Sequence, residues 1–206
     1  MSRYSLIVAV IAVLAAGAGM YIARMTGGAN APDLRSGTFL STPKTLAPFT
    51  LVDAQGSPAS LETLRGHPTL VFFGFTHCPD ICPTTLALLA DVQRAVSVPG
   101  LKVALISVDP ERDTPAAMSA YLGAFKGDFI GLTGTPPDIV QASKSFGVAS
   151  AKVDLGGGNY TMDHSATIFA VDSGARVIAI FTPPFRAAAL KTDLAALAPA
   201  LAGGAP

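Results

Sequence analysis

Residues 69–83 have the sequence TLVFFGFTHCPDICP, in which an apolar run leads through a loop with two cysteines into a helical pattern. Thr69 to Phe75 is continuously apolar and of strand length, which is typical of a strand buried on both faces. Pro83 suits the first turn of a helix, and the apolar residues of 83–96 recur on one helical face. The stretch therefore predicts two cysteines at the carboxyl end of a central strand, where open α/β sheets place their chemistry.

The rest of the chain alternates between strand and helix patterns on either side of this stretch. Helical crossovers between strands imply parallel pairing at the centre, and a closing hairpin implies an antiparallel edge. The order predicts an α/β fold, a thioredoxin-like sandwich with a central mixed sheet. The further strands expected are 49–53, 101–108, 129–132, 148–153, 167–171 and 176–181, and the further helices are 61–64, 115–125, 137–146 and 185–201.

Length and composition limit what the domain can be. The chain has 206 residues, enough for one domain with a proper core, which we place at 47–202. Residues 25–46 are rich in Gly, Ala, Pro, Ser and Thr without an apolar period, so we predict a flexible tether there. With 14 basic and 14 acidic residues and no basic run, the sequence gives no basis for nucleic-acid binding.

The N-terminal segment, residues 1–24, is predicted to be a membrane anchor. Leu6 to Ala23 carries no charge, and as a helix these residues would span about 27 Å, near the hydrocarbon thickness of a bilayer. A cleaved signal peptide is the alternative, because residues 16–18 resemble a cleavage site. The apolar run continues past that site, which favours the anchor. In both cases the domain lies on the exported side, in a periplasm or an equivalent of the intermembrane space.

The two thiols, Cys78 and Cys82, are the only cysteines of the chain. In an oxidising compartment such a pair forms a disulfide unless it is reduced or binds a metal. Pro83 predicts that Cys82 caps the helix, where the positive helix end favours thiolate. The alternative is an inert disulfide, although a bridge across so short a loop stabilises a fold little.

His164 lies far downstream, after a glycine-rich loop and just before a predicted strand, from where it can reach over the cysteine loop. Two thiolates and one imidazole form a soft, low-coordination set that suits Cu(I). Zinc usually takes four ligands, and Asp80 or Asp163 would have to supply the fourth. The alternative for a single histidine is an ordinary surface or core position.

Several neighbours of these three residues are also candidates. Asp80 is interpreted either as a weak ligand that tunes the thiols or as a solvated turn residue. Asp163 is interpreted either as an acceptor that orients His164 or as a plain strand-edge carboxylate. His77 is expected at the surface. Met118 and Met162 are soft side chains that we expect to serve in packing.

Three motifs in order resemble the Sco/SenC family of copper-handling proteins. They are FTHCPDICP at 75–83, SVDPERDTP at 107–115 and MDHS at 162–165. The resemblance covers roughly residues 45–190 together with the N-terminal anchor, and the three motifs are specific in combination.

The resemblance implies a thioredoxin-like fold and copper binding through Cys78, Cys82 and His164. It also implies a role in building the dinuclear copper centre of cytochrome c oxidase. The expected partners are then the copper-bearing subunit of the oxidase and a thiol reductase that restores the reduced cysteines.

Three other functions compete with this copper metallochaperone. A thiol–disulfide reductase acting on the cysteines of the oxidase copper site would need Cys78 and Cys82 but not His164. A peroxiredoxin-like peroxidase would need an arginine beside its thiol, and none lies near Cys78 in the sequence. A sensor domain would respond to copper or to redox state without delivering a metal ion to another protein. An enzymatic activity is therefore expected only as thiol–disulfide exchange.

Overall fold

The computed structural model describes residues 4, 17, 18 and 32–203. The predicted anchor or signal peptide at 1–24 falls almost entirely outside these residues. Within them, no helix has the length and apolar character needed to cross a membrane. The compact unit that carries the two cysteines begins at Pro32.

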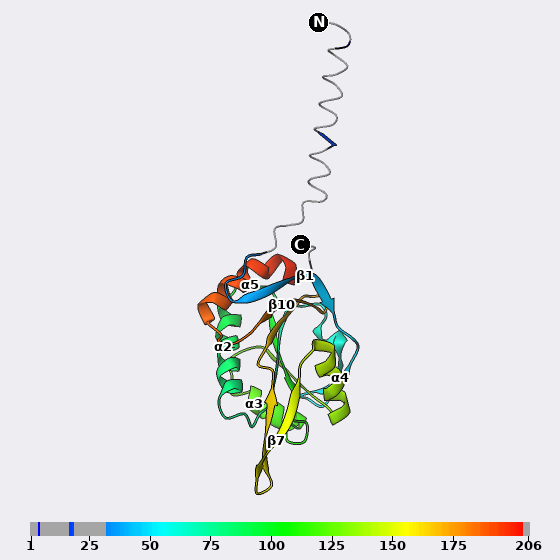
Figure 1. The fold of residues 1–206 in the computed structure, drawn as a ribbon, viewed down its shortest axis with the longest axis vertical. Coiled ribbons are helices and arrows are strands. Elements are labelled where there is room, and N and C mark those ends of the chain that lie inside the picture. The colour runs from blue at the N-terminus through cyan, green and yellow to red at the C-terminus, as the bar shows by residue number, and fades with distance from the viewer. Residues whose placement is uncertain (1–3, 5–16, 19–31, 204–206) are drawn as a thin grey trace. The chain divides into compact units, whose positions relative to one another are not determined.

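An eight-stranded mixed sheet forms the centre of the fold, with the strand order β1-β10-β9-β4-β5-β6-β2-β3. In Figure 1, α2 and α5 lie on one side of the sheet and α4 on the other. The strands of this sheet are β1 (Gly37–Thr45), β2 (Thr50–Asp53), β3 (Pro58–Ser60), β4 (Thr69–Gly74), β5 (Lys102–Ser107), β6 (Phe129–Thr133), β9 (Ile168–Val171) and β10 (Arg176–Phe181). The helices are η1 (Leu61–Leu64), α2 (Ile81–Ala95), α3 (Pro115–Leu122), α4 (Pro136–Phe146) and α5 (Ala187–Leu201).

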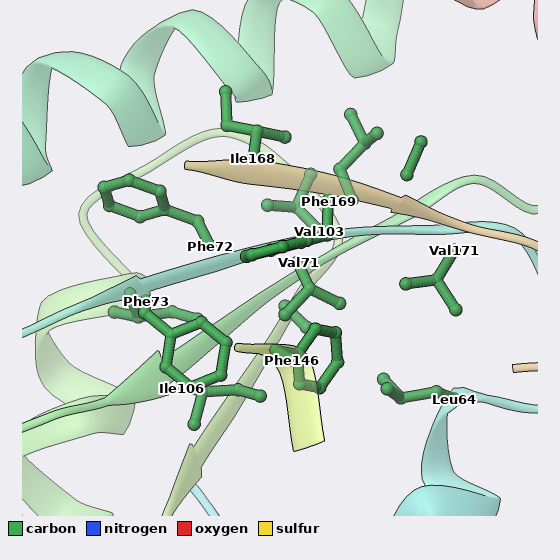
Figure 2. Packing of buried hydrophobic residues seen from close by; sticks show 14 of the residues in the cluster. Leu64, Val71, Phe72, Phe73, Val103, Ile106, Phe146, Ile168, Phe169 and Val171 are labelled. Carbon is green, nitrogen blue, oxygen red and sulfur yellow. The ribbon is translucent and has the colours of Figure 1, made fainter. Parts of the chain in front are cut away.

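Strand β4 occupies the middle of this sheet, as its apolar run predicts. It pairs parallel with β5 and antiparallel with β9, and every one of its residues is buried. Its alternate side chains enter opposite layers of the core (Figure 2). Phe73 packs on Phe146 of α4 with ring centroids 5.3 Å apart, whereas Phe72 faces the opposite side. The parallel centre and the antiparallel edge are both confirmed.

Strand β1 corrects the prediction of a flexible tether at 25–46. Residues 37–45 pair antiparallel with β10 and extend the sheet by one strand. The sequence pattern hides this strand because its register shifts between Phe39 and Lys44, which removes a regular alternation of apolar residues. Its position depends on pairing with a distant strand, which no local pattern indicates.

A separate hairpin, formed by β7 (Ser150–Gly156) and β8 (Asn159–His164), is the second difference. The expected strand at 148–153 begins and ends later, and β8 was expected as loop. Gly157 and Gly158 connect the strands with φ angles of 64° and 81°, as a type I′ turn requires. All seven residues of β7 are exposed, although Ala151, Val153 and Leu155 alternate with polar residues. The alternation therefore indicates a strand here but not that the strand lies outside the core.

Asp193 of α5 holds the chain just before β1. This buried carboxylate accepts hydrogen bonds from the backbone N–H groups of Arg35 and Ser36, at 2.7 and 2.8 Å, and from the Ser36 hydroxyl at 2.7 Å. The C-terminal helix α5 thereby fixes the position at which β1 enters the sheet.

Replacing Asp193 by Ala should lower the free energy of unfolding by about 2 kcal/mol, because two backbone donors lose their acceptor. Urea unfolding followed by circular dichroism measures this change. Thr192→Ala is the matched control, since Thr192 is exposed and bonds only to its own helix, and its effect should stay within about 0.5 kcal/mol. Equal stabilities of the two variants would contradict the role of Asp193.

Candidate metal centre

The cysteine loop leaves the carboxyl end of β4 and enters α2, as expected, but the helix begins earlier than predicted. Asp80 is the N-cap and Ile81 the first helical residue, so Cys82 lies inside the first turn rather than at the cap. Pro83 is then the third helical residue. A proline is tolerated there because a backbone N–H at that position has no partner within the helix.

The positive end of α2 faces the sulfur of Cys78. Both thiols are free, and the backbone N–H of Cys82 donates to Cys78 Sγ at 3.4 Å. Cys78 is half-buried on the loop, whereas Cys82 is fully buried. The contact with the helix start that the sequence assigns to Cys82 therefore belongs to Cys78.

Burial decides the protonation of Cys82. Removal from water raises the pKa of the Cys82 thiol far above its ordinary value, and a hydrogen bond with the Phe75 backbone opposes this only in part. The prediction that the helix end lowers this pKa is therefore wrong. The sulfur packs closely on β4, where a Cβ atom on Gly74 would lie only 3.0 Å from it. A glycine at the end of the strand makes room for the buried thiol.

His164 is the last residue of β8, and its side chain points toward the cysteine pair. Its Nε2 lies 3.6 Å from Cys82 Sγ, and its Nδ1 lies 3.3 Å from the carbonyl oxygen of Ser165. The rings of Phe72 and Phe75 each pack against the imidazole in a T-shaped, edge-to-face arrangement. Burial lowers the pKa of His164, so the ring is neutral at pH 7. With the proton on Nδ1, the Nε2 lone pair points toward the sulfur.

Two of the three predicted ligands line one small hollow, and the third lies buried beside it. A cavity of about 190 Å³ is lined by Cys78 and His164, together with Pro79, Ile81 and Met162 among others. Cys82 lies within 3.6 Å of His164. The structure thus brings together one thiol from a loop, one from a helix and one imidazole from a distant hairpin.

The two carboxylates that we expected near the site play smaller parts. Asp80 is exposed and accepts a hydrogen bond from the Thr84 hydroxyl at 3.4 Å, in agreement with its turn interpretation. Asp163 is exposed as well and lines the cavity, and its charge opposes the lowering of the His164 pKa less than the Ser165 carbonyl does. The acceptor that Nδ1 of His164 meets is the Ser165 carbonyl, which the sequence analysis missed.

The remaining candidates have packing or surface roles. Met118 is fully buried in the core, and Met162 is half-buried beside the cavity. His77 is exposed and contacts the Thr76 hydroxyl through its Nδ1 at 2.9 Å. These placements agree with the interpretations given from the sequence.

A buried carboxylate behind the cysteine loop is the main residue that sequence reasoning missed. Asp113 accepts hydrogen bonds from the Thr76 backbone N–H at 3.1 Å, from the Thr76 hydroxyl at 2.6 Å and from the Ser107 hydroxyl at 2.6 Å. It therefore fixes the loop two residues before Cys78. No local signal reveals this, because Thr76 and Asp113 are far apart in the sequence.

The spacing of the donors fits a metal ion in part. Sulfur and nitrogen ligands with metal bonds of about 2.3 and 2.0 Å, at angles near those of a tetrahedron or a triangle, lie roughly 3.5–3.8 Å apart. The 3.6 Å between Cys82 and His164 matches this spacing. Within residues 32–203, no group of three or more His, Cys, Asp and Glu side chains is already arranged to hold a metal. Cys78, on its loop, is the thiol that lines the cavity, together with the thioether of Met162.

Known proteins share this arrangement of sequence and fold. A family model described as SCO1/SenC matches residues 39–199, which contain both cysteines and His164. An SCO2-like protein of Rickettsia prowazekii is 37% identical over 138 residues, which make up 65% of this chain and 67% of the relative.

Solved structures of Sco proteins are also similar to this chain. Copper-bound ScoI of Bradyrhizobium japonicum is 41% identical, with a TM-score of 0.66 over 72% of this chain and 96% of that one. BsSco belongs to the Sco family of cytochrome c oxidase assembly proteins, and a disulfide switch has been identified in it. It is 26% identical, with a TM-score of 0.58 over 75% of this chain and 95% of that one. The thioredoxin-like fold and the resemblance are confirmed, and the chain belongs to the SCO1/SenC family.

Proposed function

We propose that the domain binds one Cu(I) through Cys78, Cys82 and His164 and delivers it to the dinuclear copper centre of cytochrome c oxidase. The observation that carries this proposal is the approach of His164 Nε2 to within 3.6 Å of a reduced, buried thiol. A structure of a relative with copper bound, and the assembly role given for another, support copper as the cargo and the oxidase as the recipient.

The chemistry of the donors suits a monovalent soft ion. Thiolates and a neutral imidazole are ligands that Cu(I) prefers. His164 is neutral at pH 7 because burial lowers its pKa, so no proton has to leave its Nε2. Cys82 has to lose its proton as copper binds, and the metal charge replaces that proton at a sulfur buried away from solvent. Transfer then proceeds by exchange of one ligand at a time with the thiols of the acceptor.

The proposal includes a membrane anchor at 1–24 with the domain on the exported side, where the copper-bearing subunit of the oxidase receives the ion. The uncharged run from Leu6 to Ala23 supports the anchor. In that compartment a thiol reductase is the partner that returns an oxidised pair to the copper-binding dithiol.

Thiol–disulfide exchange with the copper-site cysteines of the oxidase is the second candidate function. The half-buried Cys78 is the accessible thiol, and its sulfur already accepts a hydrogen bond from the backbone of Cys82. The Cys78 thiolate would attack a disulfide of the partner to form a mixed disulfide. Cys82 would then attack Cys78 Sγ, releasing the partner as a dithiol and leaving this chain oxidised. The disulfide switch of BsSco supports this alternative.

Replacing His164 by Ala separates the two functions. We expect the affinity for Cu(I) to fall at least about tenfold, which corresponds to about 1.4 kcal/mol, because one of three ligands is lost. The rate of thiol–disulfide exchange should remain, since both sulfurs are present. Anaerobic competition with a coloured Cu(I) chelator measures the affinity, and reduction of a model disulfide peptide measures the exchange.

His77→Ala is the matched control for this substitution, because His77 adjoins Cys78 but is exposed and turned to Thr76 and Asp113. Its copper affinity should equal that of the unaltered protein. Unchanged affinity in the His164 variant would remove histidine from the ligand set and favour the exchange function.

Copper binding should release protons and strengthen as pH rises from 6 to 8. The pKa of Cys82 lies above this whole range, so its thiol is protonated in the metal-free protein and each Cu(I) displaces its proton. Calorimetry in two buffers of different ionisation enthalpy counts the protons, and at least about one per copper is expected. Cys82→Ser should lose the proton assigned to this thiol. An affinity independent of pH across this range would contradict binding through the Cys82 thiolate.

A further inference from the structure

The β7–β8 hairpin that carries His164 has little support of its own. It is a two-stranded ribbon outside the main sheet, and such ribbons are marginally stable in isolation. Alternate residues of β8 point to the same face, so Tyr160, Met162 and His164 share one side. The position of the imidazole therefore depends on what that side of the hairpin contacts.

Tyr160 attaches the hairpin to the turn between β5 and α3. Its hydroxyl donates to Asp109 Oδ1 at 2.8 Å, and Asp109 is almost fully buried. The guanidinium of Arg112 lies 3.8 Å from the centre of the Tyr160 ring and donates to the Tyr160 carbonyl at 3.2 Å. Arg112 is itself oriented by a hydrogen bond from its Nε to Asp109 at 2.5 Å. His164 lies four residues after Tyr160 on the same strand, so this attachment also holds the histidine in place.

The other end of the same turn holds the cysteine loop. Asp113 receives the hydrogen bonds from Thr76 that fix the chain two residues before Cys78. The turn closes on itself, because the backbone N–H groups of Arg112 and Asp113 both donate to the carbonyl of Asp109. One turn of five residues thus contacts the hairpin through Asp109 and Arg112 and the cysteine loop through Asp113.

We propose that the turn Asp109–Asp113 is a bracket that sets the distance between His164 and the two cysteines. In this bracket Arg112 and Tyr160 are positioning residues for the histidine, and Asp113 positions the cysteine loop through Thr76. The inference rests on the proposed copper site, and it assigns to these residues an effect on metal affinity without any contact with the metal.

An exposed ion pair completes the contact but contributes less. The Nζ of Lys152 in β7 lies 2.6 Å from Oε2 of Glu111 in the turn. The same Nζ lies 3.9 Å from the centre of the Tyr160 ring. Both charged side chains are about half exposed, and ion pairs in such surroundings stabilise little. The hydrogen bond to the buried Asp109 and the stacked guanidinium of Arg112 therefore carry the attachment.

Double-mutant cycles with His164→Ala test the bracket. Tyr160→Leu should weaken Cu(I) binding roughly tenfold, the usual effect of losing a partner that orients a ligand. In the His164→Ala background it should have no further effect, because it acts only through the histidine. Thr76→Val should weaken binding in both backgrounds, because it acts through the cysteines. Anaerobic chelator competition provides all affinities.

Two further variants and one metal-free measurement sharpen this test. Tyr160→Phe should retain an intermediate affinity, since it keeps the ring under Arg112 and loses only the hydroxyl. Val153→Ala, on the exposed face of the same hairpin, should change nothing. In the metal-free protein, hydrogen exchange of the hairpin amides should accelerate in Tyr160→Leu, while the amides of β4 and β5 keep their protection.

The outcomes separate the bracket from the proposed function. Unchanged affinity in Tyr160→Leu, or an equal loss in the His164→Ala background, overturns the bracket. Unchanged affinity in His164→Ala alone overturns the ligand set, and hydrogen exchange of the hairpin then still tests whether Tyr160 and Arg112 hold it. An unaltered exchange rate in Tyr160→Leu contradicts the bracket in either case.

Discussion

Burial of the Cys82 sulfur at the carboxyl end of β4 is the constraint on which the rest of the site depends. The sulfur fits there only because Gly74 has no Cβ, and desolvation keeps the thiol protonated. A buried thiolate without a counter-charge is unfavourable. The pocket therefore favours either a neutral thiol or a thiolate paired with a cation, and it places a neutral imidazole beside that sulfur. A soft monovalent ion satisfies both groups at once.

The parts of the site differ in how firmly the fold holds them. Cys82 lies in the first turn of α2 and is buried against the central strand β4. Cys78 is on a loop, and His164 is on a ribbon in which every residue of β7 is exposed. One buried thiol with two partners outside the main sheet and helices suits the proposed delivery of copper, because an ion that must be released cannot be held by a rigid cage. Exchange of ligands can then begin at these two partners.

The sequence predicted what local patterns encode. The apolar run of β4, the cysteine spacing and the prolines indicated the central strand and its loop, and the family resemblance indicated His164. It did not predict β1, because a register shift breaks its alternation and its partner β10 is distant in the sequence. It did not predict β8 either, because this strand is short, is made mostly of polar residues and pairs with its hairpin neighbour β7 outside the main sheet. Asp113 was missed because its partner Thr76 lies far away in the sequence. The Ser165 carbonyl was missed because a backbone acceptor has no signature in the residue type. The low pKa expected for Cys82 was wrong because a helix start is visible in a sequence, whereas complete burial is not.

The most direct test of the central claim is X-ray absorption spectroscopy of the reduced protein carrying one equivalent of Cu(I). The account predicts a three-coordinate copper with two sulfur neighbours and one imidazole nitrogen, and loss of the nitrogen signal in His164→Ala. A spectrum with sulfur ligands only, or one that the histidine substitution leaves unchanged, would contradict the convergence of these three side chains on one ion.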